Sequence, residues 1–209
     1  AFSPDGREYI IRLQPGRPTP APWSNVLASP SFGSVVSESG QACTWSDNAR
    51  ELRLTPWEND PVSDRGGEVF YLRDEASGVV WSPTALPAPS GADYLTRHGF
   101  GYSVFEHTAY QIHSELTSFV SLDAPIKYMV LRLRNDSDAA RRLSATGYVE
   151  FDQVPADGLP PPDSVATLPV QAVFDGKPLA IQVTSAQPVW VSGSTCRVAC
   201  STPNRPRIT

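Results

Sequence analysis

The sequence predicts an all-β fold, an antiparallel β-sandwich with few or no helices, and three observations lead to this prediction. No stretch of about 12 residues shows an apolar i, i+3, i+4, i+7 pattern free of internal proline and glycine. The 209 residues include 21 prolines and 14 glycines, which favour turns over long helices. Between these breaks, short segments rich in β-branched and aromatic residues recur, as strands do.

Six segments of this kind are expected to form strands. They are residues 8–13, 33–38, 68–73, 102–107, 110–120 and 127–135. In the last two segments apolar side chains alternate with polar ones, so one face is buried and the other is wet. The apolar set is Tyr110, Ile112, Leu116, Val120, Met129, Leu131 and Leu133.

A polar turn at 135–138 precedes a further expected strand at 142–151. Strands of about eight residues joined at such short intervals indicate antiparallel pairing rather than a doubly wound sheet. No Gly-x-Gly-x-x-Gly follows a strand and no Gly-Lys-Ser/Thr occurs, so neither a dinucleotide site nor a P-loop is expected.

Residues 1–151 are therefore expected to form one sandwich, and residues 152–209 differ from it in composition. Four prolines within 154–163 indicate a connector. Alternating apolar runs at 165–174, 178–183 and 188–193 could add strands, whereas 196–209 is expected to be a loose tail.

Composition excludes several classes of protein. Lys and Arg number 17 against 22 Asp and Glu, a net charge of −5, and the arginines are scattered, which argues against nucleic-acid binding. No apolar run approaches the roughly 18 residues of a membrane helix. The three cysteines are too few for a disulfide framework and lack zinc-ribbon spacing, so a reducing compartment is expected. The chain opens on Ala1, which suggests a fragment or a processed chain.

The densest cluster of candidate binding residues lies at 44–64, where two prolines forbid a regular central strand. Trp45 and Trp57 could stack on the apolar faces of sugar rings, while Asn59 and Asp60 could hydrogen-bond ring hydroxyls. The alternative is that the tryptophans fill the sandwich core and the polar groups cap turns.

A second cluster lies at 96–102, where Gly99 and Gly101 permit a bulge or a tight bend. Arg97 and His98 beside this flexible backbone could bind a phosphate or a sugar hydroxyl. The alternative is a bulged strand with Arg97 in a surface or interface ion pair.

No catalytic constellation is evident. Asp60 and Asp64 lie four residues apart, but on a proline-containing loop that spacing does not establish a carboxylate pair. His98, His107 and His113 lack a metal-ligand motif, so structural or surface roles are expected for them. No Gly-x-Ser-x-Gly elbow occurs. We therefore expect no catalytic residue, no metal and no cofactor.

Six ordered segments carry a family resemblance: FSPDGREYII, TPAPWSNVLASPSFGSVVSESG, TWSDNARELRLTPWENDPVSD, EVFYLRDEASGVVWSPT, TRHGFGYSVFEH and LRLRNDSDAARRLSATGYVEF. Over residues 2–151 they resemble the N-terminal β-sandwich of family 94 glycoside phosphorylases, formerly grouped under glycosyltransferase family 36. The likeness is strongest to the phosphorylase-like region of bacterial cyclic β-1,2-glucan synthases, and cellobiose phosphorylase is more distant. Residues 152–209 do not resemble the family.

The resemblance implies a galactose-mutarotase-like supersandwich that precedes an (α/α)6 barrel carrying the catalytic aspartate. The sandwich itself would be non-catalytic, and its loops at 55–64 and 96–99 would shape the sugar site. The implied partners are a β-glucan or oligosaccharide, that barrel, and a second copy in a homodimer. A glucan synthase parent implies an inner-membrane protein with this piece on the cytoplasmic side.

Two other functions stay open. In one, the chain is a structural or oligomerisation domain whose Trp45 and Trp57 are core and interface residues. In the other, less favoured, it is an aldose-epimerase-like enzyme that would use His98, His107 and Glu106, an idea that rests on fold analogy alone.

Overall fold

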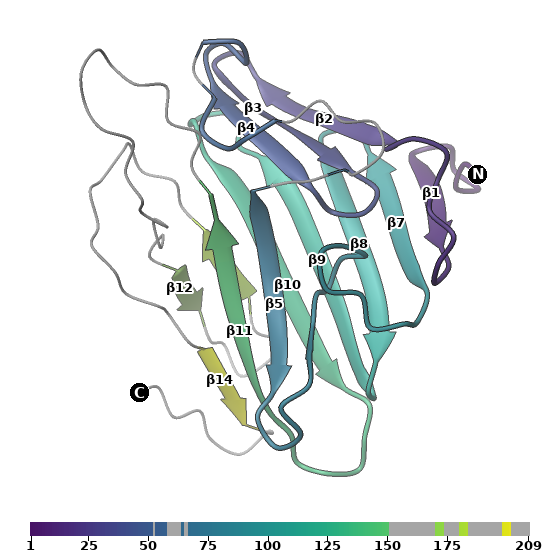
Figure 1. Cartoon of the computed structure of the whole chain (residues 1–209). Helices are drawn as coiled ribbons and strands as arrows, with labels where there is room; N and C mark the ends of the chain where they lie inside the picture. The colour runs from purple at the N-terminus through teal and green to yellow at the C-terminus, as the bar shows by residue number, and fades with distance from the viewer. Residues whose placement is uncertain are drawn as a thin grey trace.

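The computed structural model describes residues 1–51, 53–57, 64 and 67–150, together with the backbone of three short strands in the last third of the chain. The elements of this part of the chain are all strands, and every pairing between them is antiparallel. The predicted all-β sandwich is thereby confirmed (Figure 1). Within the described residues there is no helix long and apolar enough to cross a membrane.

One layer is a five-stranded sheet in the order β1-β7-β8-β9-β10. Its strands are β1 (Glu8–Leu13), β7 (Tyr94–Gly99), β8 (Tyr102–Ala109), β9 (Ile112–Val120) and β10 (Lys127–Asn135). Tight two-residue turns join β7 to β8 and β8 to β9. In the second turn Tyr110 and Gln111 both have positive φ, 51° and 62°, as a type I′ hairpin requires. The strand predicted at 110–120 therefore begins at Ile112.

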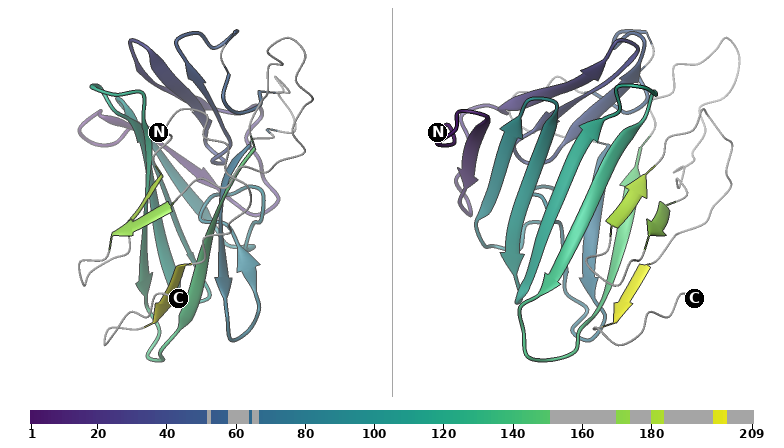
Figure 2. Two further views of the ribbon diagram at one scale, coloured as in Figure 1. Left: turned by 90° about the vertical axis from the view of Figure 1, so that its left-hand side faces the viewer. Right: turned by 180° about the vertical axis from the view of Figure 1, so that it is seen from behind.

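The other layer contains two smaller sheets. The first has the order β2-β3-β4, with β2 (Ser24–Ser29), β3 (Phe32–Ser37) and β4 (Ala42–Ser46). The second has the order β14-β11-β5-β6, with β5 (Glu68–Asp74), β6 (Val80–Trp81), β11 (Arg142–Val149) and β14 (Val198–Ser201). Edge-on, these sheets face the five-stranded sheet (Figure 2, left). A separate hairpin pairs β12 (Val170–Val173) with β13 (Ala180–Val183).

The main core lies between the two layers, and strands of all three larger sheets contribute to it. Its buried members are Leu27, Phe32, Val36, Ala42, Phe70, Leu72, Trp81, Phe105, Ile112, Leu116, Val120, Leu131, Leu143 and Ala145. The core tryptophan is Trp81, whose side chain is fully buried. Met129 and Leu133 pack against this cluster, as the alternation in their strand predicts.

Residues 8–13 and 127–135 form strands with the predicted bounds, whereas β2, β4, β6 and β7 are strands that the sequence does not predict. β14 lies within the segment 196–209 and pairs with β11. β12 and β13 fall within the predicted runs at 165–174 and 178–183. The run at 188–193 lies outside the described residues, and the domain boundary at residue 151 stays a prediction.

Candidate functional site

Trp45 lies on the outer face of the three-stranded sheet. On β4, Ala42 belongs to the core and Trp45 is three residues further on, so the two side chains point to opposite faces. Trp45 is the register partner of Gly33 on β3, and a Cβ atom at Gly33 would come within 2.3 Å of Trp45 Cζ2. The indole therefore packs directly on the Gly33 backbone, and it is half-buried.

Trp57 lies on a segment anchored beside Trp45. The backbone N–H groups of Leu54 and Thr55 donate to the Thr44 carbonyl at 2.8 and 3.3 Å, and Arg53 forms a β-bridge with Trp45. Arg53 also donates to the carbonyl of Trp57 at 3.4 Å. The Trp57 side chain is 45% exposed, so it lies outside the core. We call Trp45 and the segment 53–57 the tryptophan loop.

A buried polar cluster anchors the tryptophan loop from below. The Thr55 hydroxyl accepts from the Thr44 N–H at 2.7 Å and donates to Glu68 Oε1 at 2.9 Å. On its other side Glu68 accepts from Lys127 Nζ at 2.5 Å, and Lys127 also donates to Ser34 at 2.9 Å. Burial alone would raise the pKa of Glu68, but Lys127 and the threonine hydroxyls outweigh it and hold that pKa below its ordinary value.

The turn between β3 and β4 fixes two further segments. The Glu38 carboxylate accepts from the backbone N–H of Trp23 at 2.6 Å and from the hydroxyl of Thr19. The Ser37 hydroxyl donates to Asp64 Oδ2 at 2.6 Å, which ties the end of the long 47–67 connection to this turn. Burial raises the pKa of Glu38, and the nearby charge of Asp64 adds to that shift.

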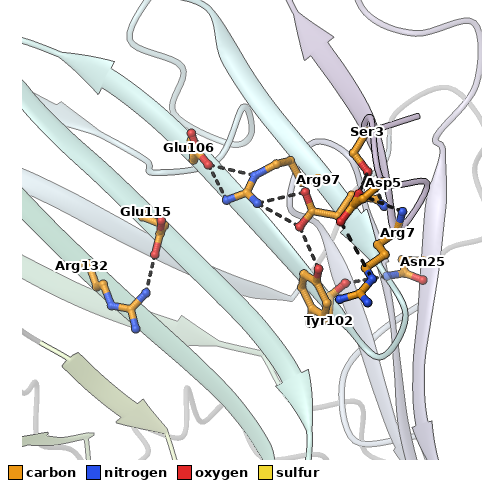
Figure 3. A network of polar contacts seen from close by, with 10 residues as sticks. Ser3, Asp5, Arg7, Asn25, Arg97, Tyr102, Glu106, Glu115 and Arg132 are labelled. Carbon is orange, nitrogen blue, oxygen red and sulfur yellow. Dashed lines mark hydrogen bonds and ion pairs between the residues drawn. The ribbon is translucent and has the colours of Figure 1, made fainter. Parts of the chain in front are cut away.

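Arg97 and His98 are neighbours on β7 and point to opposite faces of the sheet. Arg97 lies on the outward face, where its guanidinium donates to Glu106 at 2.9 Å and to both carboxylate oxygens of Glu8 at 2.9 and 3.0 Å (Figure 3). This is the ion pair of the alternative interpretation. Of the bulge or tight bend expected at Gly99 and Gly101, the structure has the tight bend, a two-residue turn with Gly101 at φ 80°.

His98 lies on the inward face and both of its ring nitrogens are bonded. Burial lowers the pKa of His98, so the ring is neutral near pH 7. Its Nε2 lies 3.0 Å from the Trp23 carbonyl, which can only accept, so Nε2 carries the proton. Nδ1 then accepts from the Ser103 hydroxyl at 2.9 Å. His98 and Arg97 therefore do not form a joint site.

No acid–base pair forms around β8. His107 is buried, stacks on Tyr94 with ring centroids 3.7 Å apart, and is bonded to Ser90 and to the Asp93 carbonyl. Glu106 points the other way and binds Arg97. The three residues considered for an epimerase thus do not converge. In the ranges the structure describes, no group of three or more His, Cys, Asp or Glu side chains could hold a metal ion.

Asn59 and Asp60 lie outside the described residues, so their place beside the tryptophan loop stays a prediction. Phe2, Tyr9 and Trp23 form a different aromatic group, which the sequence does not predict. Their rings contact edge to face, with centroids 5.1 and 5.9 Å apart, and Phe2 and Trp23 are exposed. The bridge between Phe2 and Tyr9, and the hydrogen bond of the Trp23 carbonyl to His98, the register partner of Tyr9, bring these distant residues together, and no local motif signals it.

Comparison with known proteins agrees with this architecture. Residues 7–167 match the sequence model of the family described as "Glycosyl hydrolase 94, supersandwich domain". The chain is 46% identical over 151 residues to the cyclic beta-(1,2)-glucan synthase NdvB of Rhizobium meliloti (strain 1021), which is 72% of this chain and 5% of that protein. It is 34% identical over 154 residues to the N,N'-diacetylchitobiose phosphorylase of Vibrio proteolyticus, which is 72% of this chain and 19% of that enzyme. The chain thus spans a small part of each relative's length.

Proposed function

The chain belongs to the supersandwich domains of glycosyl hydrolase family 94, and on that premise we propose that it is a non-catalytic, glucan-contacting domain of a larger glucan-processing enzyme. In this proposal the tryptophan loop forms part of the rim of a sugar site, and catalysis takes place on a separate (α/α)6 barrel. In the same proposal the parent enzyme is an inner-membrane protein, and the domain lies on its cytoplasmic side. By their names, one relative is a synthase of cyclic β-(1,2)-glucan and the other is a phosphorylase of N,N'-diacetylchitobiose.

The exposure of Trp57 on an anchored loop is the observation that carries this proposal. Trp57 is 45% exposed, and on a flexible loop so exposed an indole would have no fixed position. Here the loop is fixed to β4 by two backbone hydrogen bonds and to the core through Thr55 and Glu68. A fixed, exposed indole suits stacking against a sugar ring, because little conformational entropy is lost on binding.

A structural or oligomerisation role is the second candidate, and the packing of Trp45 favours it. Its indole packs on Gly33 and is partly buried within the domain itself. Under this alternative Trp57 would be buried by a second copy or by a neighbouring domain. The two candidates differ in whether a free sugar changes the environment of Trp57.

The test is a titration of the 209-residue chain with linear β-1,2-gluco-oligosaccharides, with cellobiose for comparison, followed by tryptophan fluorescence. We expect a saturable change that is lost in Trp57→Ala and retained in Trp23→Phe, which alters an exposed tryptophan elsewhere on the surface. An unchanged signal in the wild type, with a shift of oligomeric state in Trp57→Ala, would favour the structural role instead.

A further inference from the structure

The outward face of the five-stranded sheet carries an aromatic row that the proposed sugar site does not use. Successive register partners across β8, β9 and β10 are Tyr102, Phe119 and Tyr128. Residues directly opposite one another share one face of a sheet. The chain neighbours of Phe119, Ser118 and Val120, are buried on the core side, so this row points outward. Figure 2 (right) shows this face turned toward the viewer.

The three rings are held in place. Phe119 and Tyr128 stack with centroids 5.1 Å apart and an interplanar angle of 21°. The ring of Tyr102 lies across Gly99, where a Cβ atom would come within 2.4 Å of Tyr102 Cζ. Its hydroxyl donates to Glu8 Oε1 at 2.8 Å. With strands about 4.8 Å apart, the row spans roughly 14 Å from β7 to β10.

Charged groups lie on the same face as the row, and their charges nearly cancel. The strands of this face carry three carboxylates and four arginines, Glu8, Glu106, Glu115, Arg12, Arg97, Arg132 and Arg134, and Arg134 pairs with Asp136 in the β10–β11 turn. Most are already paired, as Arg97 is with Glu8 and Glu106, and Arg132 with Glu115 at 2.5 Å. Figure 3 shows these pairs side by side on the sheet.

This balance bears on what the face can bind. A polyanion or a strongly charged protein would have to break existing ion pairs to find a partner charge. An uncharged polyhydroxylated chain needs only hydrogen-bond donors and acceptors, which paired carboxylates and guanidinium groups still offer. The aromatic rings would stack on the apolar faces of its sugar units.

We propose that this aromatic face, formed by Tyr102, Phe119 and Tyr128, is a second carbohydrate-contact surface that binds an uncharged glucan chain. It lies on the opposite layer of the sandwich from the tryptophan loop, so one chain could contact glucan at two separate places. The inference rests on the proposed glucan-contacting function but assigns a site of its own.

The test is isothermal titration of the full 209-residue chain with linear β-1,2-gluco-oligosaccharides. We compare Phe119→Ala and Tyr128→Ala with Tyr110→Ala, an exposed tyrosine in the β8–β9 turn away from the row. Each row variant should weaken binding about tenfold, the loss of one well-stacked ring, while Tyr110→Ala leaves it unchanged. Tyr128→Phe keeps the ring and should retain binding, which guards against a variant that merely unfolds.

Two further outcomes decide between this site and the tryptophan loop. Binding that persists in Trp57→Ala and disappears when Phe119→Ala is added supports the aromatic face. Binding abolished by Trp57→Ala and untouched by both row variants overturns the aromatic face and leaves the proposed function intact. If the row variants instead turn a dimer into a monomer by light scattering, with glucan affinity unchanged, the face joins two copies of the chain and our inference is wrong.

Discussion

The buried ion pair between Lys127 and Glu68 offers a sharp test of how the tryptophan loop is positioned. Both side chains are at most 7% exposed, and their polar atoms lie 2.5 Å apart. Lys127→Met keeps most of the side-chain volume and removes the charge, which leaves Glu68 as a buried carboxylate without its cation. Breaking such a pair from one side costs about 3 to 5 kcal/mol.

That loss is large beside the roughly 5 to 15 kcal/mol of a typical domain. Urea unfolding followed by circular dichroism should show the midpoint of Lys127→Met lowered by about 1 to 3 M. The double variant Lys127→Met/Glu68→Gln removes both charges and keeps an amide oxygen for the hydroxyls of Thr44 and Thr55. It should therefore be more stable than Lys127→Met alone.

The pH dependence has a definite sign. In the wild type the pKa of Glu68 is lowered, so the pair stabilises the fold above the unfolded-state pKa and this stability is lost as pH falls through the folded-state pKa. In Lys127→Met only the hydroxyls of Thr44 and Thr55 still oppose the effect of burial, and the pKa of Glu68 should rise. The difference in free energy of unfolding between the wild type and Lys127→Met should thus become smaller from pH 7 toward pH 4. Two results would refute this reasoning. One is a decrease below about 1 kcal/mol in the free energy of unfolding of Lys127→Met. The other is a double variant whose destabilisation equals the sum of those of Lys127→Met and Glu68→Gln.

Three other predictions concern single contacts. Gly33→Ala places a Cβ atom within 2.3 Å of Trp45 Cζ2. It should lower the free energy of unfolding in urea by about 1 to 3 kcal/mol and shift the tryptophan emission. Unchanged emission would contradict the packing of Trp45 on Gly33. Arg141→Ala removes the largest of the hydrogen-bond contributions that lower the pKa of Asp74 to about 2, the others coming from the backbone N–H groups of Ser77 and Ala76, so it should cost about 1.5 to 3 kcal/mol at pH 7. The part of that cost due to Asp74 should shrink as pH falls from about 4 to 2, whereas the part due to the bond from Arg141 to the Tyr110 carbonyl stays; a wholly pH-independent loss would argue against the reasoning. Because the pKa of Glu38 is raised, wild-type stability should fall as pH rises through that pKa, and Glu38→Gln should remove this dependence in urea curves between pH 4 and 7.

The strands that the sequence predicts best are those with clean alternation. Residues 127–135 form β10 as expected, because Met129, Leu131 and Leu133 face one layer without interruption. β4 escaped prediction because its segment, ACTWS, mixes small and polar residues. Thr44 shares the inward face with Ala42, and its hydroxyl is satisfied there by Glu68 and Ser34; a buried Lys–Glu pair contributed by distant strands leaves no local pattern.

The candidate residues likewise divide into those whose placement follows from strand alternation and those whose placement depends on contacts between strands. The sequence places Arg97 and His98 in one candidate binding cluster, because the two glycines after them predict a bulge or a tight bend. Once β7 is recognised as a strand, alternation alone sends the two side chains to opposite faces. The aromatic row could not be found from the sequence, because it depends on the register that aligns Tyr102, Phe119 and Tyr128 across three strands.

The indole N–H signals of the tryptophans test the central claim most directly. The chain has five tryptophans, and each should give one resolved peak in a proton–nitrogen correlation spectrum, assigned by single Trp→Phe substitutions. On titration with β-1,2-gluco-oligosaccharide, we predict that the peak of Trp57 moves and saturates, while the peak of the core residue Trp81 stays in place. A Trp57 peak that does not move at saturating sugar would contradict the assignment of the tryptophan loop as a glucan contact.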